Sequence, residues 1–67
     1  MTLDHARALI RTQLQFGGGY NRHAVRLILG EIQREHGRGA ADDLIRELDL
    51  ETTFGLQPGR DFSGTGR

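Results

Sequence analysis

The sequence predicts a small all-α domain of three helices, and three observations lead to this prediction. Apolar residues recur at helical spacing in three segments, at about residues 3–15, 21–36 and 40–54. Glycine-containing segments at 17–19 and 37–39 separate them, and glycine is costly to hold in a helix. The composition, with 36% hydrophobic and 27% charged residues, is typical of a folded chain.

The length of 67 residues allows one domain, which we place at 1–56, followed by a flexible tail at 57–67. The dipeptide Pro58-Gly59 is typical of a turn. Beyond it the tail is rich in glycine, and Phe62 is its one apolar residue. We expect the tail to be disordered unless a partner fixes Phe62.

The first predicted helix begins after Thr2, whose hydroxyl suits an N-cap. Asp4 then falls in the first turn, where the helix dipole favours an anion. The apolar residues of this segment share one helical face. They are Leu3, Ala6, Ile10 and Leu14.

The second predicted helix begins at Asn21, a good N-cap residue, and ends near His36, with Gly37 as the first residue beyond it. Gly30 lies inside this helix at a cost of about 1 kcal/mol relative to alanine. We interpret it as the mark of a close helix crossing. The segment carries a wide apolar stripe, formed by Ala24, Val25, Ile28, Leu29 and Ile32.

The third predicted helix begins near Ala40, with acidic residues at 42 and 43 in its first turn. Leu50 falls off the apolar spacing of this segment, so we expect a kink or a new short turn near Asp49. The pair Gly55-Leu56 is typical of a Schellman motif, in which the residue after glycine folds back on the last turn.

A single core of this size rarely supplies more than about 3–5 kcal/mol, so self-association is a serious alternative to a monomer. The second helix has basic residues near its start and acidic residues near its end, the reverse of what its dipole favours. Antiparallel pairing of two copies would bring these charges together. We therefore expect a regulatory or adaptor protein that binds a protein partner and forms a homodimer through Val25, Ile28, Leu29 and Ile32.

The alternative function is a nucleic-acid-binding regulator, because the charge is unevenly distributed. Residues 1–30 have a net charge of +3 and residues 31–67 a net charge of −3. Against this alternative, the whole chain has no net charge. Its third predicted helix is acidic, and the phosphate groups of a nucleic acid repel an acidic helix. An anion or nucleic-acid patch would comprise Arg7, Arg11, Arg22, His23 and Arg26.

Enzymatic activity is not expected. There is no cysteine and the one serine lies in the predicted tail. The chain also has little room for a water-excluding pocket. The three histidines lack metal-ligand spacing, so we expect no metal and no cofactor. No run of about 18 apolar residues predicts a membrane span. No signal peptide is visible and cysteine is absent, so we expect a cytoplasmic protein.

One family resemblance rests on the order of the elements. A loop of the form Phe16-Gly17-Gly18-Gly19-Tyr20 joins two helices, and a short glycine-containing turn leads to a third helix that contains Leu44, Ile45 and Leu48. This order resembles the ubiquitin-associated type of three-helix domain, over about residues 3–50. The second predicted helix is longer than in that family and the loop has more glycines, so we base no prediction on the resemblance.

Overall fold

The computed structural model describes residues 1–16, 19–60 and 62 of the chain. Over these residues it contains helices and no strand, which confirms the predicted all-α fold. One of the three predicted helices is divided in two. The helices are α1 (Leu3–Phe16), α2 (Gly19–His36), α3 (Arg38–Glu47) and α4 (Leu50–Phe54).

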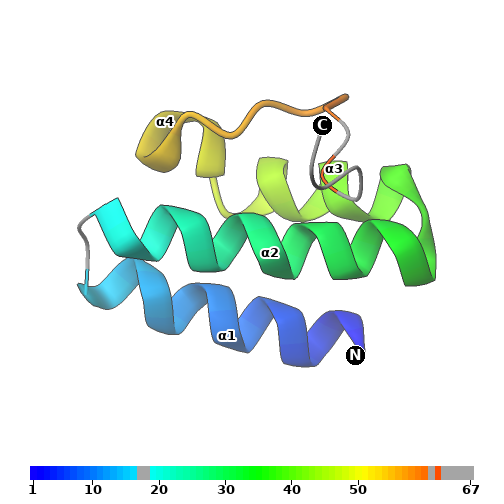
Figure 1. Cartoon of the computed structure of the whole chain (residues 1–67), viewed down its shortest axis with the longest axis horizontal. Coiled ribbons are helices and arrows are strands. Elements are labelled where there is room, and N and C mark those ends of the chain that lie inside the picture. Colours follow the sequence, from blue (N-terminus) through cyan, green and yellow to red (C-terminus); the bar gives the residue numbers. More distant parts are fainter. Residues whose placement is uncertain (17–18, 61, 63–67) are drawn as a thin grey trace.

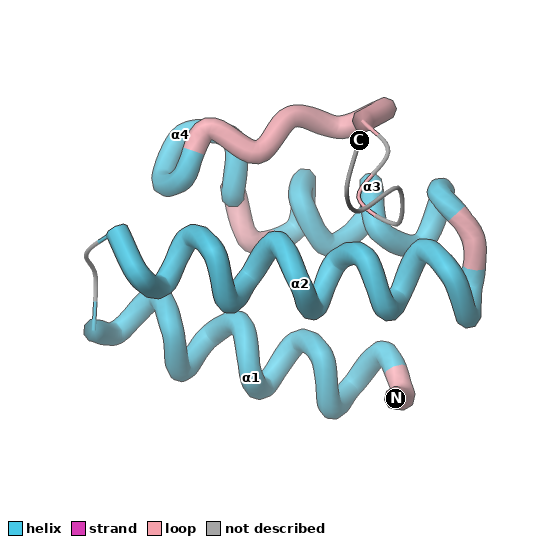
Figure 2. The backbone as a smooth tube through the Cα atoms, viewed as in Figure 1, coloured by secondary structure: helices cyan, strands magenta, loops and turns pink. Residues whose placement is uncertain are grey.

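The long helix α2 packs against α1 on one side and against α3 on the other. Figure 1 shows α1 and α2 side by side and antiparallel, with α3 running back along α2. The short helix α4 packs against α3. After α4 the chain turns and runs back along α2, as the loop-coloured segment in Figure 2 shows. This returning segment belongs almost entirely to residues 57–67, which the sequence predicted to be a flexible tail.

The first helix forms as its sequence predicts. The Thr2 hydroxyl oxygen accepts the backbone N–H of His5 at 3.1 Å, so Thr2 is its N-cap. Ala6 and Ile10 are fully buried, and Leu3 and Leu14 are partly buried against the same core. The predicted stripe therefore faces the interior.

The boundaries of α2 and α3 differ slightly from the prediction. Helix α2 begins at Gly19, so Asn21 lies inside its first turn and is not an N-cap. Gly37 has a φ of 97° and is the single residue between α2 and α3. Its N–H donates to the Gln33 carbonyl at 3.0 Å, which closes the last turn of α2. Because α3 already begins at Arg38, the acidic residues at 42 and 43 lie beyond its first turn.

The expected break near Asp49 is present. Asp49 has a φ of 54° and a ψ of 47°, in the left-handed region, and separates α3 from α4. A continuous helix would carry Leu50 off the buried face. The break returns Leu50 to the core, where it is fully buried.

The end of α4 resembles the predicted Schellman motif but is one residue wider. Gly55 is left-handed, with a φ of 74°, and donates to the Glu51 carbonyl at 2.8 Å. The Leu56 N–H reaches back six residues to the Leu50 carbonyl at 3.3 Å. The Leu56 side chain is buried, as expected, and the chain leaves α4 in the direction of α2.

One hydrophobic core joins all four helices and the returning segment. Burying a large apolar side chain contributes about 1.5–3 kcal/mol, so these residues dominate the stability of the fold. The buried residues are Ala6, Ile10, Val25, Leu29, Ile32, Ala41, Leu44, Ile45, Leu50, Leu56 and Phe62.

Candidate functional site

The segment that follows α4, which we call the C-terminal strap (residues 56–60 and 62), is fastened to α2 and α3. The Gly59 N–H donates to Asp42 Oδ1 of α3 at 2.8 Å. The Phe62 N–H donates to Gln33 Oε1 of α2 at 2.9 Å, and Phe62 is 6% exposed. Phe62 thus packs against its own chain, whereas we expected a partner to be needed. Flexibility of 57–67 stays a prediction, and residues 61 and 63–67 lie outside the described part.

Gly30 is where the strap crosses α2. A Cβ atom at this position would lie 2.6 Å from the carbonyl oxygen of Phe62. Real Cβ atoms do not approach backbone so closely, so glycine is required for the crossing. The sequence indicated a close approach at Gly30 but not its partner, which is the strap and not a helix.

The strap brings a third arginine to two arginines of α2. Arg22 and Arg26 lie one turn apart on the same face of α2. Arg60 of the strap joins them around a pocket of about 480 Å³. We call it the arginine pocket. The residues that line it are Arg22, Arg26, Gly55, Leu56, Gln57, Arg60 and Phe62.

The arginine pocket is positively charged and in part preorganised. Arg22 Nε donates to the Phe54 carbonyl at the end of α4, at 2.7 Å. This bond uses one of the five N–H donors of the guanidinium group and fixes its position. Arg60 Nη2 lies 3.5 Å from Gln57 Oε1, within the strap. None of the described residues that line the pocket is acidic, so the arrangement suits an anion.

The other two arginines of the predicted patch belong to a different cluster. Arg7 Nη1 lies 2.7 Å from Asp4 Oδ1, and Arg7 Nε lies 2.7 Å from Glu47 Oε2 of α3. Arg11 Nη2 lies 3.8 Å from the same Glu47 oxygen. Two carboxylates therefore face two arginines. The two arginine pairs of the predicted patch therefore have different partners.

Arg7 is held more closely than an ordinary surface arginine. Its side chain is 27% exposed. The Nε atom is buried and lacks hydrogen-bond geometry, so its contact with Glu47 is an ion pair. That contact, with a smaller effect from Asp4, raises the pKa of Arg7. His23, the last member of the predicted patch, is exposed and does not line the arginine pocket.

The predicted dimer interface is occupied by the fold itself. Val25, Leu29 and Ile32 are fully buried in the core of the single chain, and Ile28 is partly buried against it. Three of the four predicted interface residues are thus covered within the single chain, and the homodimer stays a prediction. Among the described residues, Leu27 is the large hydrophobic residue that is exposed, at 53%.

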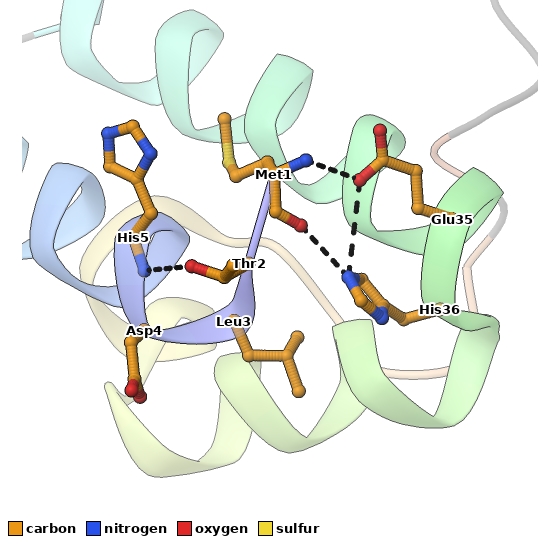
Figure 3. Close-up of a pocket in the computed structure, with 7 residues that line it drawn as sticks. All are labelled: Met1, Thr2, Leu3, Asp4, His5, Glu35 and His36. Carbon is orange, nitrogen blue, oxygen red and sulfur yellow. Dashed lines mark hydrogen bonds and ion pairs between the residues drawn. The ribbon is translucent and has the colours of Figure 1, made fainter.

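A second, open depression of about 620 Å³ lies where the chain begins, beside the end of α2 (Figure 3). The Met1 amino nitrogen lies 2.7 Å from Glu35 Oε1 and 3.6 Å from Glu31 Oε2. The Met1 carbonyl lies 2.9 Å from His36 Nε2. A carbonyl only accepts, so Nε2 carries the proton in this contact. Met1, Glu35 and His36 thus bind one another.

The contact between Met1 and Glu35 shifts the pKa values of both groups. The hydrogen bond from the amino group lowers the pKa of Glu35 below its ordinary value. The same bond raises the pKa of the Met1 amino group. Each charge stabilises the other, as in any ion pair. We assign this depression a structural role, joining the start of α1 to the end of α2.

Sequence reasoning missed Arg60 and Gln57, because both lie in the predicted tail. Two signals pointed to the strap. Gly30 is an unfavourable residue inside a helix, and Phe62 is an isolated apolar residue in a polar segment. Taken together, they would have predicted that the tail returns to α2.

Comparisons of the chain with protein-family models, with curated proteins and with solved structures find no match. In the described part of the chain, no helix has the length and apolar character needed to cross a bilayer. The same residues contain no group of three or more histidine and acidic side chains placed to hold a metal ion.

Proposed function

We propose that this chain is a non-enzymatic adaptor module that binds an acidic group of a protein partner in the arginine pocket. One observation carries the proposal. Arg22, Arg26 and Arg60 meet around one pocket although they come from two separate parts of the chain, and its described lining residues include no carboxylate. Arginine clusters of this kind recognise acidic and phosphorylated motifs in proteins.

The chemistry of the lining residues favours binding over catalysis. Guanidinium groups stay protonated at all ordinary pH values and do not exchange protons with a substrate. The amide of Gln57 is no nucleophile and no general base. The pocket therefore supplies positive charge and hydrogen-bond donors, which is what recognition of an anion needs. We propose the cytoplasm as its compartment, and the absence of cysteine from the sequence agrees with a reducing environment.

The geometry gives less support to the other functions considered. A homodimer through α2 would need Val25, Leu29 and Ile32, which are buried in the fold. Nucleic-acid binding gains from a continuous basic face. Arg7 and Arg11 would extend such a face, but both lie against Glu47.

Affinity capture from cells with three forms of the protein tests the proposal. The forms are the wild type, the pocket variant Arg22→Gln/Arg26→Gln, and a matched variant, Arg38→Gln/Arg46→Gln, which loses the same charge from α3. We expect the wild type and the matched variant to retain the same protein after nuclease treatment, and the pocket variant to lose it. Equal capture by both variants, or capture that nuclease abolishes, would contradict the proposal.

A further inference from the structure

We propose that the arginine pocket is a site for a phosphate monoester, presented by a phosphorylated side chain of the partner and completed by docking of the C-terminal strap. The inference rests on the proposed function, which requires only an acidic group. It adds the chemical class of that group and the condition under which the pocket exists.

The charge of the pocket selects the ligand. Three guanidinium groups line about 480 Å³, and like charges repel one another unless an anion lies between them. A carboxylate brings one negative charge and two oxygens, which one arginine fork can satisfy. A phosphate monoester brings a charge of about −1.5 to −2 near neutral pH and three acceptor oxygens. It therefore offsets more of the repulsion and has an acceptor for each arginine.

The positions of the arginines suit a ligand that enters between α2 and the strap. Arg22 is fixed by its bond to the Phe54 carbonyl, so less side-chain freedom is lost when a ligand binds. Arg26 lies one turn further along the same face of α2. Arg60 lines the pocket from the strap. A phosphodiester carries a single charge per phosphate and matches this arrangement less well.

The strap makes the pocket conditional. Leu56, Gln57, Arg60 and Phe62 all line it and all belong to the strap. When the strap leaves α2, the pocket loses one wall and one of its three arginines. A ligand that binds only the complete pocket must therefore favour the docked strap, and the docked strap must favour the ligand by the same factor.

Two glycines allow a matched test of this condition. Gly30→Ala places a Cβ atom 2.6 Å from the Phe62 carbonyl oxygen, which displaces the strap without removing any arginine. Gly39 lies in the first turn of α3, and a Cβ atom there meets nothing within 4 Å. Gly39→Ala is therefore the control, with the same chemical change at a helical position where the added methyl group meets nothing.

The first experiment compares three probes by following the arginine Nε–H resonances of the full chain. The probes are capped phosphoserine, capped glutamate and a dinucleotide with one phosphodiester. We expect phosphoserine to bind at least about tenfold more tightly than the other two, which corresponds to one charge-assisted hydrogen bond. Equal affinity for glutamate would overturn the phosphate assignment and leave the proposed function standing. Tighter binding of the dinucleotide would overturn both, and so would binding of none of the three.

The second experiment tests the strap. We expect Gly30→Ala to weaken phosphoserine binding at least about tenfold, the loss of one charge-assisted contact, while Gly39→Ala binds as the wild type does. If Gly30→Ala does not fold, the wild type still gives an answer. Saturating phosphoserine must slow hydrogen exchange of the Gly59 and Phe62 amides, which donate to Asp42 and Gln33. Unchanged exchange at both amides would overturn the coupling.

Discussion

Two pairs of arginines have the same helical spacing and different surroundings. Arg7 and Arg11 of α1 lie four residues apart, as do Arg22 and Arg26 of α2. The first pair lies against Glu47. The second pair lines a pocket with Arg60. The first pair forms ion pairs with Asp4 and Glu47, and the second contributes to a positively charged pocket.

The difference between the pairs comes from residues far away in the sequence. Glu47 reaches the first pair because α3 packs antiparallel to α2, beside the α1–α2 pair. Arg60 reaches the second pair because the strap is fastened to α2 at Gly30 and Gln33. Spacing along a helix predicts which arginines share a face, but not what faces them.

The largest effect is expected from removing the anchor of the strap. Phe62→Ala should lower the free energy of unfolding by about 1.5–3 kcal/mol, because it removes a buried aromatic side chain. Protection of the Gly59 amide from exchange should fall with it, while the α1 amides near Arg7 stay protected. Urea unfolding and hydrogen exchange measure both.

The control for this change is Leu27→Ala, which removes an exposed side chain of α2. It should change the free energy of unfolding by no more than about 0.5 kcal/mol. If Phe62→Ala cost no more than this control, the strap would not be anchored as described.

The next effect concerns the arginine pair of α1. Glu47→Gln should lower the free energy of unfolding, since Arg7 loses its carboxylate partner on α3. The loss should shrink at high salt, which screens ion pairs. Urea unfolding at two salt concentrations measures it. Glu51→Gln, the same change at an exposed position of α4, should be neutral, and equal effects would contradict the account.

A smaller effect separates the two arginines of the pocket. Arg22→Gln removes the bond to the Phe54 carbonyl and should cost about 0.5–1 kcal/mol of unfolding free energy. Arg26→Gln should cost about nothing, because it removes a positive charge near other arginines. Melting temperatures of the two variants test this. A larger loss for Arg26→Gln would assign that residue a structural role.

The smallest effect is the pH dependence of the contact between Met1 and Glu35. The lowered pKa of Glu35 means that its stabilisation is present above the ordinary value of 4.5 and is lost as the pH falls below it. The raised pKa of the Met1 amino group means that its contribution to stability is present below pH 8.0 and is lost as the pH rises above that value. The stability difference between wild type and Glu35→Gln should therefore peak between these values.

Unfolding curves recorded from about pH 3 to about pH 10, beyond both ordinary pKa values, measure this difference. The protein must begin at Met1 with a free amino group, which its mass establishes. Acetylation of that group is the control and should flatten the profile. A difference that does not vary with pH would show that the pair contributes nothing.

Much of the fold could be predicted because its determinants are local. Thr2 caps α1, Gly37 ends α2, and the break at Asp49 follows from the position of Leu50 off the apolar spacing. These features depend on residues within a turn or two of each other. The missing element was the strap, because its contacts with Gly30 and Gln33 join residues about thirty positions apart in the sequence.

The candidate site was less predictable than the fold. The sequence placed Arg22 and Arg26 together, and the structure does too. It also grouped Arg7 and Arg11 with them, although that pair forms ion pairs with Asp4 and Glu47. The apolar stripe of α2 was interpreted as a dimer interface. The stripe is covered by α1, α3 and the strap, and contacts between segments so far apart in the sequence cannot be seen in its local pattern. The sequence pattern shows which residues are apolar, and only the packing of the folded chain shows which residues cover them.

The most direct test of the account is a titration of the full chain with capped phosphoserine, in which each arginine Nε–H resonance is followed separately. The account predicts that the signals of Arg22, Arg26 and Arg60 shift together with one dissociation constant, while those of Arg7 and Arg11 stay in place. Equal shifts of all five signals, or shifts confined to Arg7 and Arg11, would contradict the division into an arginine pair held by ion pairs and a binding pocket.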